Sequence, residues 1–515
     1  MRVKNSIINI SAGLGSQIII TSLSFISRTV FINSLGVEYL GINGLFTNIL
    51  AMLSLAEAGI GSSIVYSLYK PVAENDQEKI NILMRLYRKA YLVIALIVLL
   101  LGLSLMPFLG YFIKDSNVEH VHWIYLIFLL NTVAPYLYMH KNSFLSVCQK
   151  GYIVTGIYSI SSIVSICLKI GVLQFTKNYI LYLIIDSIIT ITTSIILAII
   201  VNKMYPFLRE KVASKLDIET KDKIVKNVKA IVLQNIGNYL VLGTDNIIIS
   251  SFISVAAVGL YSNYNMLIDI CRNFTYQIFN NTYHSVGNLV AKESLDKVYS
   301  VYKVYNFLNF WLYSFCSIFL CIIMDPFITL WIGSKFLMSK GVLFILMIIF
   351  YERGMRNAIT TVKTTAGIFQ EDRYAPLYQA AVNLIFSIIF VRYIGIAGVF
   401  LGTLISVLAV PFWFTPYLVY KKVFKKAVTS YYIRYMYYAT VGLGTYFITS
   451  FLSNFVLLNG LWGLILKGIV CLIVPNLIYV CIFHKTNEFQ YLCGILKNIV
   501  GKLLRRKELN KEITY

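Results

Sequence analysis

Apolar stretches of about 20 residues recur along this chain from one end to the other, and each is long enough to cross the core of a bilayer as a helix. A helix satisfies its own backbone hydrogen bonds, which lipid cannot do. Only 13% of the 515 residues are charged, about half the share found in soluble proteins. We therefore predict an all-α polytopic membrane protein. The predicted transmembrane helices number about 14 and lie near residues 8–33, 40–66, 90–113, 122–148, 153–173, 179–202, 230–252, 257–285, 304–324, 342–367, 376–394, 396–420, 435–453 and 461–483.

Basic residues are distributed unevenly between the two ends of these helices. The segments predicted on the side of the N-terminus carry 32 Lys and Arg residues, and the opposite loops carry 5. Cytoplasmic loops of membrane proteins are enriched in Lys and Arg, so both termini are predicted to be cytoplasmic. The same rule explains the net charge of +22 without any binding to nucleic acid. The first apolar stretch is too long for a signal peptide and is interpreted as an uncleaved span.

The two halves of the chain resemble each other. Residues 35–41 (LGVEYLG) and 253–259 (ISVAAVG) lie 218 positions apart and follow the predicted first and seventh spans. Six spans per half give both halves the same orientation, so we expect an axis along the membrane normal and a substrate site between the lobes. The predicted domains are two six-helix lobes, 1–202 and 230–420, a basic cytoplasmic linker, 203–229, two additional helices, 435–483, and a basic cytoplasmic tail, 484–515.

Four basic side chains lie inside predicted spans on polar helix faces. Arg353, Arg356 and Lys363 share one face of a single span, and Arg28 lies in the first span. A cation in hydrocarbon costs at least about 2.5–3.5 kcal/mol, so it is expected to face a water-filled cavity or a partner. Arginine presents a planar fork of donors that fits phosphate oxygens. These residues are therefore predicted to line a central cationic cavity that binds a diphosphate.

Acidic side chains also lie inside the predicted spans. Arg28 and Asp245 occupy equivalent positions in the two halves at an offset of 217, so they are placed to pair if the lobes face each other. Glu57 and Asp245 are candidate sites of cation coupling, and Asp269 is a further candidate for coupling or for pairing between lobes. Alternatively, Asp269 and Arg272, three residues apart on one helix face, neutralise each other as a structural pair.

No pattern in the chain indicates a metal site or catalysis. None of the eight cysteines forms a CxxC pair, and the five histidines lack metal-ligand spacing, so neither disulfides nor a cofactor is expected. The predicted outer loops are short and lack the acid/base groups that a membrane-embedded glycosyltransferase or polymerase would use. We therefore expect a transporter and not an enzyme.

Two segments near the N-terminus resemble a known family. They are residues 28–46, RTVFINSLGVEYLGINGLF, and residues 53–61, LSLAEAGIG, followed by Tyr69-Lys70-Pro71. Both resemble Wzx-type polysaccharide flippases of the multidrug/oligosaccharidyl-lipid/polysaccharide exporter superfamily. The resemblance implies two six-helix lobes around a cavity that opens alternately to each side, with cationic cavity residues at Arg28 and Arg272. It also implies export of undecaprenyl-diphosphate-linked oligosaccharide repeat units across the cytoplasmic membrane of a bacterium, for a capsule or another exopolysaccharide.

Alternative functions follow from the same resemblance. Many members have twelve spans, and two additional C-terminal spans are shared with lipid II flippases, so a peptidoglycan precursor stays open as the substrate. A cation-coupled multidrug exporter of the same superfamily is a second alternative, although its cationic substrates would favour acidic cavity groups. A glycosyltransferase or polymerase is a distant third. The expected partners are the lipid-linked oligosaccharide, membrane lipids and the polysaccharide polymerase machinery.

Overall fold

The computed structural model describes residues 2–57, 60–114, 118–148, 150–210, 222, 228, 239–241, 243–368, 371–494 and 497. Most of the predicted linker, 203–229, and the end of the predicted tail, 484–515, lie outside these residues. The described residues form helices joined by short turns and contain no strand, so the predicted all-α class is confirmed.

The described helices have the length and composition of membrane spans. Seven are long and apolar enough to cross a bilayer, and two bent helix pairs raise this number to nine if each pair forms one span. In α8 (Gly151–Thr176) only 6% of the most apolar window is buried inside the protein. An apolar helix surface of this size suits contact with lipid and not with water. The polytopic membrane fold is confirmed, and the number 14 stays a prediction.

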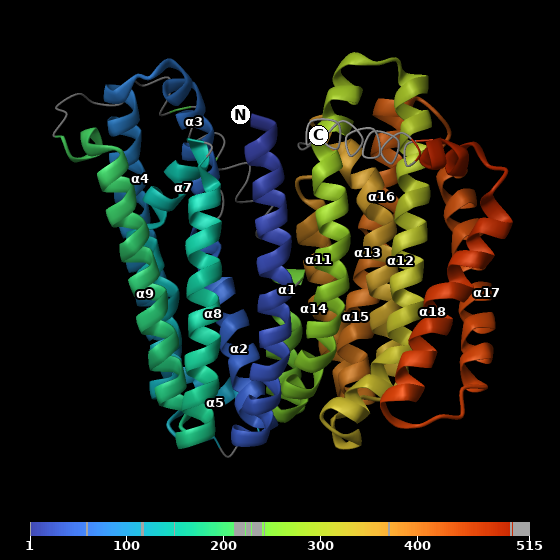
Figure 1. The fold of residues 1–515 in the computed structure, drawn as a ribbon, viewed down its shortest axis with the longest axis horizontal. Helices are drawn as coiled ribbons and strands as arrows, with labels where there is room; N and C mark the ends of the chain where they lie inside the picture. Colours follow the sequence, from blue (N-terminus) through green and yellow to red (C-terminus); the bar gives the residue numbers. More distant parts are fainter. Residues whose placement is uncertain are drawn as a thin grey trace, which may run out of the picture. The chain divides into compact units, whose positions relative to one another are not determined.

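The first compact unit comprises Met1–Ser262 and Pro376–Val399. Within it α1 packs along α8, and α8 packs along α9 (Figure 1). The predicted span 40–66 is not one continuous helix, because α2 ends at Leu53 and α3 begins at Ile60. The elements of this unit are α1 (Arg2–Leu35), α2 (Val37–Leu53), η1 (Ser54–Glu57), α3 (Ile60–Glu74), α4 (Gln77–Leu105), α5 (Leu109–Phe112), α6 (Val121–Val133), η3 (Ala134–Leu137), α7 (Met139–Val147), α8, α9 (Tyr179–Met204), the helix 239–252, the start of α11 (Val255–Lys292) and α14 (Ala375–Ile394).

A reciprocal contact within this unit joins the two segments of the internal repeat. A Cβ atom on Gly41 would lie 1.9 Å from the carbonyl oxygen of Val255, and one on Gly259 would lie 2.2 Å from the carbonyl oxygen of Val37. The two valines are the first residues of α2 and α11. Each valine and each glycine lies 218 positions from its counterpart in the other repeat, so the two contacts are equivalent. The two helix starts therefore cross so closely that only glycine fits at either position.

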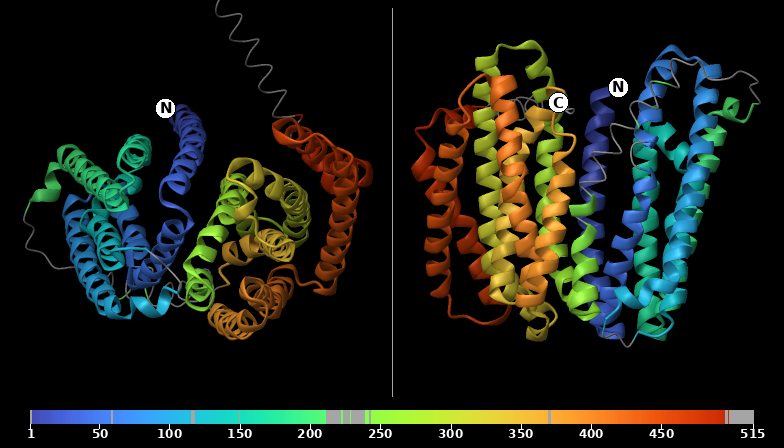
Figure 2. Two further views of the ribbon diagram at one scale, coloured as in Figure 1. Left: turned by 90° about the horizontal axis from the view of Figure 1, so that it is seen from below. Right: turned by 180° about the vertical axis from the view of Figure 1, so that it is seen from behind.

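The second compact unit comprises Asn263–Ala375 and Phe400–Tyr515. Its long helix α12 packs along α13 and α18, and α17 and α18 lie side by side at the edge of this unit (Figure 2). At Gly354 of α13 an added Cβ would lie 2.1 Å from the ring of Tyr313, so α12 and α13 approach closely there. The helices of this unit are the remainder of α11, α12 (Leu295–Trp331), α13 (Lys340–Thr365), α15 (Ile396–Ala409), α16 (Pro411–Val419), α17 (Thr429–Asn454) and α18 (Gly460–Phe483).

Candidate functional site

Arg28 lies near the end of α1, half-buried in the first unit. Its Nη2 atom donates a hydrogen bond to the Ser262 hydroxyl at 3.0 Å, and that hydroxyl donates to the Gly259 carbonyl at 2.8 Å. Because serine is neutral, the contact with Ser262 holds Arg28 in place without cancelling its charge.

Glu57 lies where the second predicted span is interrupted, at the end of η1. Its carboxylate accepts a hydrogen bond from the Tyr91 hydroxyl of α4. The ring of Tyr136 packs edge-on against Tyr91 at 5.8 Å between centroids, and its hydroxyl interacts with the same carboxylate. A Cβ on Gly61 would lie 2.3 Å from the Tyr91 hydroxyl oxygen, so this arrangement needs glycine there. Glu57 is thus held by tyrosine hydroxyls inside the first unit.

Asp245 is buried on the helix 239–252, with 9% of its surface exposed. The adjacent Thr244 hydroxyl donates to the side-chain oxygen of Asn383 on α14 at 3.3 Å. Thr244, next to Asp245 in the chain, thus joins two helices of the first unit through a polar contact. The recorded hydrogen bond of Arg28 goes to Ser262, so the predicted pairing of Arg28 with Asp245 stays a prediction.

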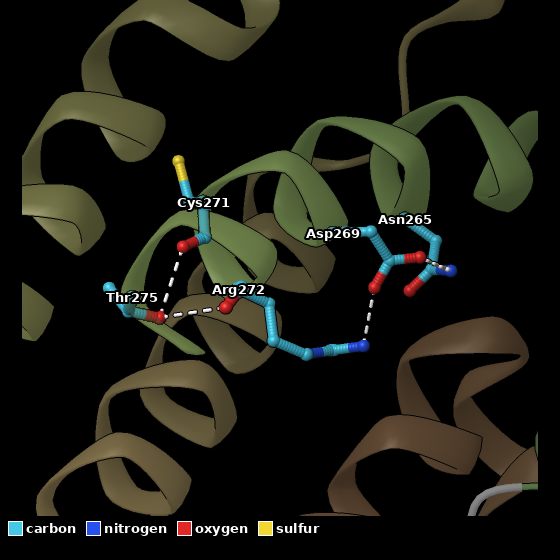
Figure 3. A network of polar contacts seen from close by, with 5 residues as sticks. All are labelled: Asn265, Asp269, Cys271, Arg272 and Thr275. Atoms are coloured by element: carbon cyan, nitrogen blue, oxygen red, sulfur yellow. Dashed lines mark hydrogen bonds and ion pairs between the residues drawn. The ribbon is translucent and has the colours of Figure 1, made fainter. Parts of the chain in front are cut away.

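Asp269 and Arg272 form an ion pair on α11 in the second unit (Figure 3). The Asn265 amide also donates to Asp269, at 2.8 Å, so the carboxylate is held from two sides. The two side chains stay 39% and 46% exposed. The pair predicted as the structural alternative is therefore formed, and it leaves the Arg272 guanidinium accessible to a further ligand.

Arg353 and Arg356 are half-buried on α13. The Nη2 atom of Arg356 lies 3.3 Å from Oε2 of Glu352, one helical turn earlier, and their side chains are 14% and 2% exposed. Arg353 also interacts electrostatically with Glu352. One buried acid thus faces two arginines on this helix.

Lys363 forms a buried ion pair with Asp372, with side chains 8% and 11% exposed. α13 ends at Thr365, and the following turn brings Asp372 back against the end of the helix. No acidic partner for Lys363 was evident from the sequence, because Asp372 lies nine positions away and outside the predicted span. Lys363 is therefore neutralised, and its contact with a substrate stays a prediction.

The structure brings the candidate residues together only in part. Arg28, Glu57 and Asp245 lie in the first unit, and Asp269, Arg272, Arg353, Arg356 and Lys363 lie in the second. A cavity shared by the two lobes stays a prediction.

Sequence analysis also missed an ion pair between neighbouring spans. Lys169 of α8 lies 2.8 Å from Asp186 of α9, and Ser165 donates to the same carboxylate at 2.9 Å. The sequence contained a signal for this pair, because Lys169 and Asp186 carry opposite charges at similar depths in two adjacent predicted spans.

No family model matches the sequence, and no curated protein is similar to it at the level of sequence. The structure, in contrast, is similar to solved membrane transporters. An inward-facing multidrug resistance MATE family transporter of the MOP superfamily is 14% identical, with a TM-score of 0.58 over 76% of this chain and 91% of that one. The Vibrio cholerae MATE transporter VcmN is 15% identical, with a TM-score of 0.57 over 81% and 98% of the two chains.

The lipid II flippase MurJ, in an inward closed conformation, is 16% identical to this chain. Its TM-score is 0.62, and the match covers 92% of this chain and 99% of MurJ. At these identities the comparison establishes the fold. The chain has the polytopic helical fold seen in the MATE transporters and in the flippase MurJ.

Proposed function

We propose that this protein is an alternating-access flippase in the cytoplasmic membrane of a bacterium. Its proposed substrate is an undecaprenyl-diphosphate-linked oligosaccharide repeat unit, moved from the cytoplasmic to the outer leaflet for the synthesis of a cell-surface polysaccharide. Arg28 and Arg272 are its first candidate diphosphate contacts, with Arg353 and Arg356 as further candidates. The fold shared with MurJ, whose name identifies it as a lipid II flippase, supports the class of reaction.

The observation that carries this proposal is the exposure of Arg272. Its side chain lies on α11 in the predicted span 257–285, is paired with Asp269 and still exposes 46% of its surface. An intramembrane arginine is costly, so exposure at such a position indicates access to water or to an anionic ligand. The guanidinium has five N–H donors in a planar fork, more than one carboxylate uses. A diphosphate would fit the remaining donors.

The charge of the substrate also bears on the energetics of export. With a negative cytoplasm, outward movement of one uncompensated negative charge gains about 2.3 kcal/mol per 100 mV. The membrane potential therefore favours export of a diphosphate, and the basic side chains are needed mainly to lower the barrier of the hydrocarbon core. Cation coupling at Glu57, Asp245 or Asp269 would add to this driving force.

The test is translocation in proteoliposomes. A short-chain undecaprenyl-diphosphate oligosaccharide is placed in the vesicles, and its exposure to an added glycosidase that cannot cross the membrane is followed over time. We expect protein-dependent translocation, slowed about tenfold or more in Arg28→Ala and in Arg272→Ala, because each loses a charge-assisted hydrogen bond. The matched control is Lys467→Ala, which removes a basic side chain from α18 and should leave the rate unchanged.

Three outcomes would contradict the proposal. Equal rates in the wild-type protein and both arginine variants would remove these residues from the substrate site. Absence of translocation under any imposed gradient, together with extrusion of a cationic dye, would favour a cation-coupled drug exporter. That second candidate is supported by the similarity to the MATE transporters. Translocation of lipid II in preference to the oligosaccharide would identify a peptidoglycan precursor flippase.

A further inference from the structure

Glu352 is the most unusual charged residue in the described part of the chain. It lies within α13, in the predicted span 342–367, and exposes only 1% of its surface. Among the described residues, no group donates a hydrogen bond to either of its carboxylate oxygens. A buried carboxylate without donors is costly when it is ionised, and such a group commonly binds a proton instead. The position therefore favours a group that changes its protonation state.

The surroundings of Glu352 contain one close counter-charge. Arg356 lies 3.3 Å away on the same helix, at ion-pair distance but outside hydrogen-bond geometry. Arg353 on α13 and the hydroxyls of Tyr431 and Tyr435 on α17 also interact electrostatically with Glu352. Among the described residues, no second acid interacts with the Glu352 carboxylate. Its proton and the Arg356 guanidinium therefore compete for the same site.

Further buried polar atoms lie on α13 and on α17. The Tyr351 hydroxyl and one Arg434 nitrogen are buried and have no hydrogen-bond partner among the described residues. The ring of Tyr351 packs against Tyr435, with 6.3 Å between centroids. Unsatisfied buried polar atoms are the positions at which proteins hold internal water.

Arg434 also lines a pocket of about 410 Å³ at the start of α17. Arg434 and Tyr438, one turn apart on the helix, line it together with Phe307 of α12 and Glu488 beyond α18. Arg434 lies 3.6 Å from the Glu488 carboxylate there. Helical spacing places Arg434 and Tyr438 on the same face of α17 as Tyr431 and Tyr435.

We propose that Glu352 is a proton-binding site that controls the availability of Arg356. While Glu352 is ionised, it holds the guanidinium in the ion pair. When the carboxylate takes up one proton from solvent, it becomes a neutral carboxylic acid, no other bond changes, and Arg356 is released to bind a phosphate oxygen. This proposal rests on the proposed function, because it makes a diphosphate the ligand of the released arginine. Binding of the diphosphate and uptake of a proton are then linked.

The first test measures protons taken up on ligand binding, with farnesyl diphosphate as the probe and the full-length protein in detergent. Titration calorimetry in two buffers of different ionisation enthalpy gives the number of protons bound per diphosphate. The wild-type protein should take up one proton more than Glu352→Gln, whose side chain mimics the protonated acid. The variant should bind the probe at least as tightly as the wild-type protein. Glu371→Gln, which removes the acid of an exposed pair with Lys422, is the matched control and should behave as wild type.

A second measurement does not depend on the ligand. The infrared difference spectrum between low and high pH should contain a carboxylic-acid C=O band that is lost in Glu352→Gln and kept in Glu371→Gln. Equal proton uptake in the wild-type protein and Glu352→Gln, or a band that persists in that variant, would overturn the proposal. If the wild-type protein does not bind farnesyl diphosphate, the proposed substrate class fails, and the infrared result alone decides whether Glu352 binds a proton.

Discussion

Substitution of either glycine at the crossing of α2 and α11 should destabilise the protein. Gly41→Ala introduces a Cβ 1.9 Å from the Val255 carbonyl oxygen, and Gly259→Ala introduces one 2.2 Å from the Val37 carbonyl oxygen. In both cases the neighbour is backbone, which cannot rotate away as a flexible side chain can. Both helix starts must therefore move apart.

The size of the effect follows from these distances. To bring the new Cβ even to 3.0 Å, the two helix starts must separate by about 1 Å. A gap of that size forfeits about a quarter to a half of the dispersion energy of the affected contacts. Overpacking of this kind typically costs about 1–3 kcal/mol, and contact with backbone places both variants toward the upper end. A single separation of the two helix starts relieves both clashes. The loss in free energy of unfolding of the double variant should therefore be smaller than the sum of the losses of the two single variants.

The assay is the free energy of unfolding in mixed detergent micelles, from a titration with a denaturing detergent. Alanine is a better helix former than glycine by up to about 1 kcal/mol, and this gain opposes the clash. Gly156→Ala on α8 measures the gain alone, because no atom lies within 4 Å of its added Cβ. We expect Gly156→Ala to be neutral or stabilising, and both crossing variants to be destabilised relative to it.

Two results would refute this reasoning. Stabilities of Gly41→Ala and Gly259→Ala equal to that of Gly156→Ala would show that the helix starts do not approach as closely as the structure indicates. Fully additive costs in the double variant would show that the two contacts are independent, and so are not two halves of one crossing.

Two further predictions concern the second unit. Lys363→Ala should lower the free energy of unfolding by about 3–5 kcal/mol, because it leaves the buried Asp372 without its partner. Adding Asp372→Ala should restore part of that loss, as measured by an unfolding titration. Translocation by a stable double variant would show that Lys363 does not bind substrate. Trp311→Phe removes the hydrogen bond of 2.7 Å from α12 to Asn476 of α18, and it should lower the free energy of unfolding by about 0.5–1.5 kcal/mol. The α17–α18 segment should then be proteolysed faster than in the wild-type protein, which locates the effect. Unchanged proteolysis there would show that this bond does not hold α18 against α12.

The membrane fold could be predicted from the sequence because hydrocarbon leaves few alternatives. Long apolar stretches have to be helices, and their recurrence along the chain required many of them. The repeat was also visible, since Gly41 and Gly259 occupy equivalent positions in two short matching segments. What the sequence did not show is that each glycine contacts the opposite repeat. That relation depends on how two helices cross, which no local pattern specifies.

The partners of the charged residues were much harder to predict. Spacing on a helix face reveals a pair such as Asp269 and Arg272, since both lie on one element. Asp372 reaches Lys363 through the turn after α13, and Tyr91 reaches Glu57 from another helix. Such contacts depend on tertiary packing, so the stripe of basic residues on α13 looked less compensated in sequence than it is.

Compensation of charge divides the basic residues into groups with different roles. Lys363 has a buried acid of its own, and both side chains are almost fully enclosed, which is the pattern of a structural pair. Arg272 has an acid but remains 46% exposed, so a competing anion can reach it. Arg356 lies between these cases, because it is only 14% exposed and its acid lacks hydrogen-bond donors among the described residues. A carboxylate that is costly to keep ionised takes up a proton readily, and the arginine that it holds is then released. Lys363 is not released in this way. Arg356 is therefore the residue at which proton binding and anion binding are coupled.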